Sequence, residues 1–420
     1  MTVARFLPRR RAPYRPNADA PSPYMEAVRA GERIYLSAQS NARHDGKVGA
    51  PGDAVAQTNA SMDCLEAALA AAGASLADIT KLTTCIVDRS HRRAVYGTIN
   101  RRLPSVYPVS TGLVVAGLPA PEMVVQIDAE AISPAAGAGA VRRYRKYDYP
   151  NWHGQNFAWQ GCMVAAGASE LFVRGQTGSR LDGTGTVGLG RRPEDAAVQA
   201  ELALSNLTIL LKEAGCGLDD VAKITVYISD RAYRTAVYPM IGKHFRTIHP
   251  VSTGIIVQAF ARPEILFELD VHALTKVSGQ PHTRLRKYHS RSARYGGEQQ
   301  PLDCDFCMAV RVGDRVILRG QTGMDLSEVL RGRGDASSQA EQAMDNVAVL
   351  LGEAGARLSD VVKATVYVTD RAFLPGVSDV ILARLSGASP AFSAFIIKGL
   401  ASPELLMEVD ITAVVGAASV

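Results

Sequence analysis

Cysteine, long apolar runs and clustered charge of one sign are all scarce in this sequence. Six cysteines in 420 residues are too few for a disulfide framework. No apolar run approaches the roughly 20 residues of a membrane-spanning helix, and the first residues lack the apolar core of a signal peptide. The 46 basic and 41 acidic residues are spread along the chain. We therefore expect a cytoplasmic protein without a membrane segment or a nucleic-acid-binding face.

Spacings typical of metal and cofactor sites are also missing. Cys304 and Cys307 form a CxxC pair without a second half at matching spacing, so we interpret them as two reduced thiols. The eight histidines show no H-x-x-x-H pattern. The glycine-rich stretch 178–190 lacks the Lys-Ser/Thr ending of a phosphate-binding loop, which leaves a flexible lid or a plain surface loop. The sequence thus indicates no metal and no cofactor.

The sequence does contain one pattern three times. Residues 81–89, 223–231 and 363–371 each run from a lysine to an Asp-Arg pair, at offsets of 142 and then 140 residues. Pro108, Pro250 and Pro390 follow at the same offsets, as do Glu122, Glu264 and Glu404. We therefore expect a disordered basic tail over residues 1–15 and three repeats over residues 16–133, 144–275 and 285–414.

Each repeat predicts the same order of elements. In the first, apolar residues at helical spacing follow Asp53, a candidate N-cap, and end at Gly73. Asp195 with Gly215 and Asp335 with Gly355 repeat this frame. Two strands precede the helix, and the lysine strand, a shorter helix and two extended runs follow it. The prediction is an α+β unit of order ββαβαββ, with a mostly antiparallel sheet and two helices on one face.

The uncovered face of such a sheet needs a partner. In a chain with three copies, the other copies supply it. We predict an intrachain pseudo-trimer, a ring with sheets inward, helices outward and clefts between neighbouring repeats. Pairing of two rings into a homodimer stays open.

Several motifs resemble the Rid family of YjgF-type proteins. They are Pro23-Tyr24, Gly175-Gln176, Gly320-Gln321, Ala214-Gly215, residues 223–230 and residues 267–270. The resemblance implies the chorismate-mutase-like fold of that family, trimers with sites between subunits, and hydrolysis of reactive imines and enamines to ketones and ammonia.

The sequence departs from the family at its site residues. Where active deaminases of the family carry a carboxylate-binding arginine, the repeats have Ser110, Ser252 and Phe392. The family glutamate that holds the hydrolytic water corresponds to Gln126, Glu268 and Glu408. The family tyrosine matches Tyr24, and the other repeats have Gly161 and Phe306.

Two groups of residues are candidates for chemistry. If the last two runs of each repeat form a hairpin, Ser252 and Glu268 face each other and can position a water, or they form a plain surface pair. The runs 174–178 and 319–323 are both Arg-Gly-Gln-Thr-Gly. We expect Arg174 and Arg319 to replace the lost anion clamp, or to pair with a carboxylate of a neighbouring repeat. Four further residues of these runs complete the predicted binding set: Gln176, Thr177, Gln321 and Thr322.

Other repeated residues favour structural roles. Cys162 and Cys307 are expected to be small buried side chains. Lys81, Lys223 and Lys363 are expected to be solvated charges at strand edges, and Asp88, Asp230 and Asp370 to be helix caps.

The favoured function is a cofactor-independent enzyme for a small anionic imine, enamine or related carbonyl compound. Water addition or proton transfer would take place in clefts built from repeats two and three, because copy one carries Ser110 and Gln126. Two alternatives remain: a lyase, cyclase or chorismatase-like hydrolase, and a non-catalytic ligand-binding or scaffold protein.

Overall fold

The computed structural model describes residues 2–8, 24–40, 48–134, 140–150, 157–290, 294–295, 298–299, 302–416 and 418–419. The order ββαβαββ is confirmed in each repeat. The first repeat comprises β2 (Met25–Ala30), β3 (Arg33–Leu36), α1 (Ala54–Ala71), β4 (Ile79–Ile86), α2 (Arg92–Arg102), β5 (Val109–Val114) and β6 (Val125–Ile132). The second comprises β10 (Val164–Ala166), β11 (Glu170–Thr177), α3 (Pro193–Glu213), β12 (Val221–Ile228), α4 (Arg234–Phe245), β13 (Val251–Ile256) and β15 (Phe267–Leu274). The third comprises β21 (Ala309–Val312), β22 (Arg315–Leu318), α5 (Ala336–Glu353), β23 (Val361–Val368), α6 (Leu374–Arg384), β24 (Ala391–Ile396) and β25 (Met407–Val414).

Short strands lie outside this common order. They are β1 (Thr2–Pro8), β7 (Arg142–Tyr144), β8 (Tyr147–Tyr149), β9 (Trp159–Gly161), β14 (Ala259–Phe260), β16 (Thr283–Leu285), β17 (Tyr288–His289), β18 (Arg294–Tyr295), β19 (Glu298–Gln299), β20 (Asp305–Phe306) and β26 (Ala418–Ser419). Strand β1 pairs with β2 along most of its length. The predicted disordered tail is therefore wrong for residues 2–8, because the free edge of β2 provides backbone partners for them. Residues 9–15 lie outside the described part.

The local signals at the helix ends are mostly confirmed. Asp53 and Asp335 cap α1 and α5 through backbone N–H groups. Gly73 and Gly355 end these helices with φ values of +71° and +70°, a region that favours glycine. In the second repeat Asp195 is not the N-cap, because α3 begins two residues earlier at Pro193. A proline fits the first helical position, where no N–H is required.

The strand order corrects the predicted hairpin. In each repeat the lysine strand lies between the last two strands: β12 is parallel to β13 and antiparallel to β15. Ser252 is opposite Ile224, and Glu268 is opposite Tyr227, so this serine and glutamate do not face each other across a hairpin. The cause is the helix α4, which connects β12 and β13 as a parallel crossover.

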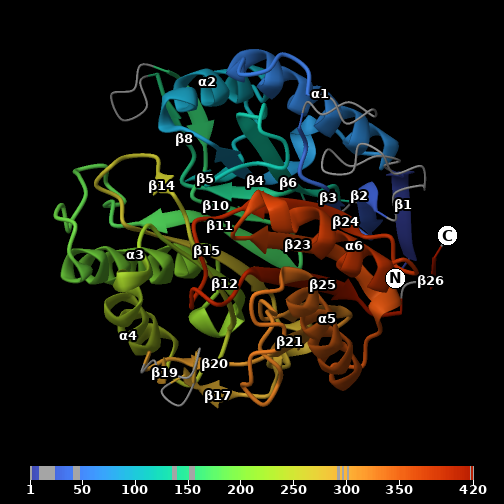
Figure 1. Cartoon of the computed structure of the whole chain (residues 1–420). Coiled ribbons are helices and arrows are strands. Elements are labelled where there is room, and N and C mark those ends of the chain that lie inside the picture. Colours follow the sequence, from blue (N-terminus) through green and yellow to red (C-terminus); the bar gives the residue numbers. More distant parts are fainter. Residues whose placement is uncertain are drawn as a thin grey trace.

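The three repeats contact one another in cyclic order. Figure 1 shows the strands gathered in the interior, with helices such as α1, α3 and α5 at the periphery. Each lysine of the repeated pattern forms an ion pair with an aspartate of the next repeat. The pairs are Lys81 with Asp270 (2.6 Å), Lys223 with Asp410 (2.6 Å) and Lys363 with Asp128 (2.7 Å). These lysines were expected to be solvated, but the neighbouring repeat covers the sheet face on which they lie.

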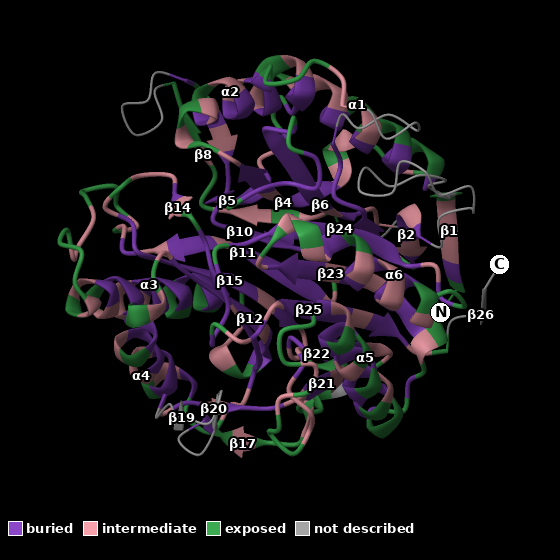
Figure 2. Cartoon of the chain, viewed as in Figure 1, coloured by how far each residue is buried: buried purple, intermediate pink, exposed green. Residues whose placement is uncertain are grey.

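The sheets are also joined between repeats. Strands β2 and β24 connect the sheets of repeats 1 and 3, and β14 of repeat 2 pairs with β5 of repeat 1. The buried residues follow the strands and the inner faces of the helices (Figure 2). Within the described residues, no helix has both the length and the apolar character needed to cross a bilayer.

Candidate active site

Two clefts lie at the junctions between repeats. Cleft 1/2 lies between repeats 1 and 2, and its lining includes Arg92, Tyr96, Ser110, Gly112, Arg174, Gly175, Thr177, Arg262 and Glu268. Cleft 2/3 lies between repeats 2 and 3, and its lining includes Arg234, Tyr238, Ser252, Gly254, Arg319, Gly320, Thr322, Glu328 and Glu408. Cleft 2/3 has an empty volume of about 870 Å³, solvent-open space included, and cleft 1/2 has about 510 Å³.

A buried glutamate lies in each cleft. Glu268 on β15 is 6% exposed, and Glu408 on β25 is 7% exposed. Each carboxyl group rests against a glycine of the adjacent repeated run. A Cβ atom added to Gly175 would overlap the Glu268 carboxyl group, and one added to Gly320 would overlap that of Glu408. The glycines therefore provide the space in which these side chains lie.

The two carboxyl groups share an unusual protonation state. Burial, followed by the nearby Asp270 carboxylate, raises the pKa of Glu268 to about 8. Burial and Asp410 raise the pKa of Glu408 to the same value. Desolvation disfavours the charged form of a carboxyl group, so both glutamates carry a proton at neutral pH. Each is thus able to donate that proton to a bound molecule.

The neighbouring repeat supplies an arginine and a tyrosine from its second helix. Arg92 and Tyr96 lie one helical turn apart on α2, with the guanidinium 4.3 Å from the ring centre. Arg234 and Tyr238 have the same arrangement on α4, with a separation of 4.7 Å. Both pairs lie over a glycine of the adjacent strand: Cβ atoms at Gly112 and Gly254 would meet the tyrosine hydroxyls.

Sequence reasoning did not single out these arginine and tyrosine residues. The available signal was an Arg-x-x-x-Tyr pattern that recurs at the repeat offset of 142 residues. The third repeat lacks it, because Leu374 and Ser378 occupy the corresponding positions.

The predicted anion anchors lie in the two clefts. Arg174 lines cleft 1/2, with its guanidinium 5.3 Å from the Tyr147 ring. Arg319 lines cleft 2/3 and lies 5.4 Å from the ring of Tyr288. Each also approaches a methionine sulfur of its own repeat, at 3.6 and 3.7 Å. Aromatic contacts of this kind hold a guanidinium in place while its N–H groups face a ligand.

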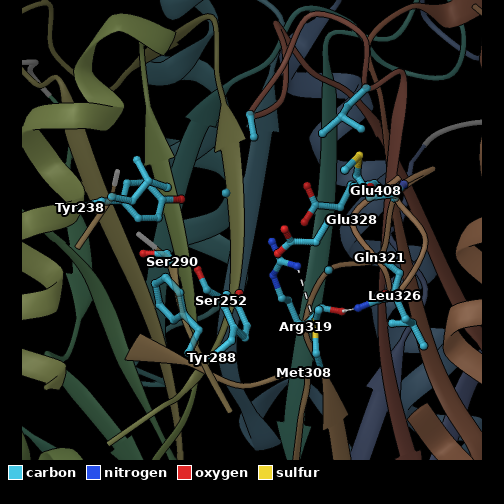
Figure 3. Close-up of a pocket in the computed structure, with 18 of the residues that line it drawn as sticks. Tyr238, Ser252, Tyr288, Ser290, Met308, Arg319, Gln321, Leu326, Glu328 and Glu408 are labelled. Carbon is cyan, nitrogen blue, oxygen red and sulfur yellow. Dashed lines mark hydrogen bonds between the residues drawn. The ribbon is translucent and has the colours of Figure 1, made fainter. Parts of the chain in front are cut away.

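The serines are placed with the glutamates of the following repeat. Ser110 lines the same cleft as Glu268, and Ser252 lines the same cleft as Glu408. Figure 3 shows Ser252 and Tyr238 on one side of cleft 2/3, with Arg319, Glu328 and Glu408 on the other. The expected pairing of Ser252 with Glu268 is thus wrong, and each of these serines shares its cleft with a glutamate of the following repeat.

The remaining predicted binding residues divide between cleft walls and supporting positions. Thr177 lines cleft 1/2, and Thr322 lines cleft 2/3. The side chain of Gln176 donates a hydrogen bond to the Arg174 carbonyl at 2.7 Å. Gln321 does the same for Arg319 at 2.8 Å, and it also lines cleft 2/3. These glutamines fix the backbone that carries the arginines.

The third junction, between repeats 3 and 1, has a different set of side chains. The positions that correspond to Arg234, Tyr238, Ser252, Gly254, Arg319, Gly320 and Glu408 of cleft 2/3 are occupied, in that order, by Leu374, Ser378, Phe392, Ala394, Ser37, Ala38 and Gln126. Phe392 and Tyr24 are each 4% exposed, and their ring centres are 5.6 Å apart. Tyr24 therefore packs against Phe392 and is not placed with Glu268 or Glu408.

The repeated cysteines have no activated character. Burial raises the pKa values of the Cys162 and Cys307 thiols to about 12, and both residues are nearly or fully inaccessible. A nucleophilic cysteine needs a lowered pKa. The interpretation of Cys162 and Cys307 as small buried side chains is consistent with this environment.

Comparisons with known proteins agree on the family. The family model described as Endoribonuclease L-PSP matches residues 15–133, 164–275 and 300–415. A 2-iminobutanoate/2-iminopropanoate deaminase from Dermatophagoides farinae is 32% identical over 94 residues, which cover 22% of this chain and 73% of that protein. A RutC family protein from Pyrococcus abyssi is 37% identical over 65 residues, covering 16% of this chain and 51% of the relative.

One solved structure resembles most of the chain. It is a chorismatase with a TM-score of 0.53 and 17% identity, and the match covers 80% of this chain and 93% of that one. At this level of identity the likeness shows the fold alone.

Proposed function

Since the chain belongs to the Endoribonuclease L-PSP family, which includes the YjgF-type Rid proteins, we propose that it is a cofactor-independent enzyme. Its substrate is a small anionic imine, enamine or related carbonyl compound, and the chemistry takes place in clefts 1/2 and 2/3. The deaminase name of the relative from Dermatophagoides farinae supports the imine class.

The observation that carries the proposal is the duplicated constellation. Both clefts combine a protonated glutamate and an arginine from one repeat with an arginine, a tyrosine and a serine from the preceding repeat. At the third junction these five side chains, and the two glycines beside them, are all replaced by other residues. Side chains that are kept together in two places and replaced together in the third act as one unit.

The constellation suits addition of water to an imine. In cleft 2/3, Arg319 and Arg234 hold the substrate carboxylate, and Glu408 transfers its proton to the imine nitrogen. Water then adds to the carbon, and the ionised Glu408 accepts one of the water protons. A second proton transfer from Glu408 to nitrogen releases ammonia, and the hydroxyl proton of the intermediate returns to the glutamate. Imine and water thus give carbonyl compound and ammonia, with Glu408 regenerated.

A hydrolase for a ring-bearing carboxylate is the second candidate. Cleft 2/3 is the larger one, and part of its wall is apolar through Leu302, Phe306, Leu326 and Leu405. A protonated glutamate beside an arginine pair also suits proton transfer to the terminal carbon of an enol ether, after which water adds to the carbon that bears the ether oxygen and the resulting hemiketal releases the alcohol. Release of ammonia from an imine, measured against release of pyruvate from an enolpyruvyl ether, separates the two reactions.

Replacement of the two glutamates tests the proposal. We expect Glu268→Gln and Glu408→Gln each to remove part of the ammonia release from freshly generated 2-iminopropanoate. The double variant should lose about 100-fold or more in kcat/KM, the range typical of a missing proton donor. Amide side chains keep the size and remove the transferable proton.

Glu66→Gln serves as the matched control. Glu66 is largely exposed and pairs with Arg102 on the protein surface, so its loss should leave the rate unchanged. A double variant that is folded and as fast as the parent protein would contradict the proposed role of the buried glutamates.

A further inference from the structure

The two clefts share their central residues but differ in the charges around them. Cleft 1/2 is lined by the arginines 92, 174 and 262, with Glu268 as the acidic residue among the described lining. Cleft 2/3 is lined by two arginines, 234 and 319, and has Asp325 and Glu328 in addition to Glu408. With both buried glutamates protonated, the lining of cleft 1/2 has a net positive charge. In cleft 2/3 the two arginines are balanced by the two further carboxylates.

Arg262 is the extra positive residue of cleft 1/2. Its Nε faces Glu264 at 3.2 Å, and its Nη2 donates to the hydroxyls of Ser179 and Thr186 at 3.1 and 2.6 Å. These contacts hold the guanidinium at the cleft wall and leave the two N–H groups of Nη1 for a ligand. The corresponding residue of repeat 3 is Ser402, which has no charge.

Glu328 is the extra negative residue of cleft 2/3. It belongs to the stretch between Gln321 and Asp335, which is five residues shorter than the corresponding stretch between Gln176 and Asp195 of repeat 2. Figure 3 places its side chain on the same side of the cleft as Arg319 and Glu408. Asp325, by contrast, is compensated by Arg331 at 2.9 Å, outside the cleft lining.

Ion-pair partners outside the two linings reduce the difference in net charge between cleft 1/2 and cleft 2/3. Glu264 offsets part of the charge of Arg262, and Arg331 offsets that of Asp325. Glu328 is exposed and has no ion pair among the described residues, so its negative charge lies uncompensated at the solvent-facing part of the wall of cleft 2/3. Like charges inside a partly enclosed site reject a ligand, and opposite charges select it.

We propose that the two clefts take substrates of different charge. Cleft 1/2 binds compounds with two carboxylates, the second held by Arg262. Cleft 2/3 binds compounds in which a carboxylate is combined with an amino or other cationic group, which Glu328 receives. Glu328 and Arg262 are thus specificity-determining residues, and the assignment rests on the proposed function in taking both clefts as substrate sites.

Two inert compounds of equal length test this assignment. Glutarate and 5-aminopentanoate share a five-carbon chain and one carboxylate, and they differ in the charge of the far end. Binding to the full chain is measured by calorimetry for the parent protein, Arg262→Ser and Glu328→Gln. Arg262→Ser should weaken glutarate binding about tenfold and leave 5-aminopentanoate unchanged, whereas Glu328→Gln should have the opposite pattern.

The exposed pair of Arg145 and Glu213 provides matched controls. Both side chains are more than a third exposed and lie outside the two cleft linings, so Arg145→Ser and Glu213→Gln should change neither affinity. Thermal melting verifies that every variant is folded.

The proposal is overturned if either compound fails to bind at millimolar concentration, or if both respond to the same substitution. This result is separable from failure of the proposed function, because binding requires no turnover. Charge discrimination without ammonia release from any imine would refute imine hydrolysis alone. Ammonia release without discrimination would refute the charge assignment alone.

Discussion

Glu268 and Glu408 are uncharged at neutral pH because the preceding repeat covers them. Their side chains are almost inaccessible, and a carboxylate two residues farther along each strand adds repulsion. Gln126 occupies the corresponding position at the third junction. Its amide has a shape similar to that of a carboxylic acid, but it is not an acid that transfers a proton. The protonation state is therefore what distinguishes the clefts from the third junction at this position.

The pH dependence of the rate tests the protonation state of these two glutamates. A glutamic acid that donates its proton must be protonated at the start of the reaction, and its pKa is about 8 in both clefts. We expect kcat/KM for imine hydrolysis to be constant below this pH and to fall tenfold per unit above it. A rate that rises through pH 8 would show that the ionised form is the active one.

The same pKa values predict a stability effect. The folded pKa lies above the ordinary value of 4.5, so folding favours the protonated form. This contribution is complete below pH 4.5 and is lost as the pH rises to about 8. Glu268→Gln should therefore be more stable than the parent protein at pH 8, by on the order of 1–3 kcal/mol, and similar at pH 4.5. Urea unfolding at the two pH values measures the difference.

At the scale of elements, the strands β11 and β22 make room for the glutamates. Gly175 and Gly320 lie under the carboxyl groups, and repeat 1 has Ala38 at the same place, together with Gln126. The glycine and the glutamate therefore change together between repeats. The helices α2 and α4 add the arginine and tyrosine from the other wall.

A methyl group at these glycines should remove the function of one cleft at a time. In Gly175→Ala and Gly320→Ala the new Cβ displaces the glutamate, and we expect kcat in the affected cleft to fall by about tenfold or more. Gly352→Ala is the control: it lies in α5 with open space around it, and it should raise stability by about 0.5–1 kcal/mol. Unchanged kcat in Gly175→Ala combined with Gly320→Ala would contradict the crowding argument.

At the scale of the whole molecule, the cyclic Lys–Asp contacts hold the repeats together. The Lys223 and Asp410 side chains are 14% and 11% exposed, and Thr253 donates a further hydrogen bond to Asp410. A second set of charges between the repeats is unequal: Glu170 pairs with both Arg33 and Arg315, which occupy the corresponding positions of the other repeats. Three identical side chains at these positions could not form this ion pair. The contact therefore depends on the sequence difference between the three repeats.

Removal of one partner of a largely buried ion pair should weaken the contact between repeats 2 and 3. We expect Asp410→Ala to lower the free energy of unfolding by about 3–5 kcal/mol, because Lys223 is left buried without its counter-charge. Glu213→Ala breaks the exposed pair with Arg145 and should cost less than about 1 kcal/mol. Equal losses in the two variants, measured by urea unfolding, would show that the junction between repeats contributes little.

The repeats, the order of their elements and several helix ends follow from local features of the amino-acid sequence. Asp53, Asp335, Gly73 and Gly355 act on their own helix within a few residues, so local chemistry was sufficient to place them. The three aspartates before the second helices are likewise N-caps, as predicted. The family resemblance pointed to Glu268 and Glu408, whose role as site residues stays a prediction.

Which residues meet across the junctions depends on how the repeats pack against one another. Ser110 and Glu268 are separated by more than a hundred residues and share a cleft, whereas Ser252 and Glu268 were expected to meet and do not. The three repeated lysines are largely covered for the same reason. The hydrophobic period and the spacing of residues indicate which residues are neighbours within one helix or strand. The partner across a junction depends on how a parallel crossover orders the strands and on which repeat covers the exposed sheet face.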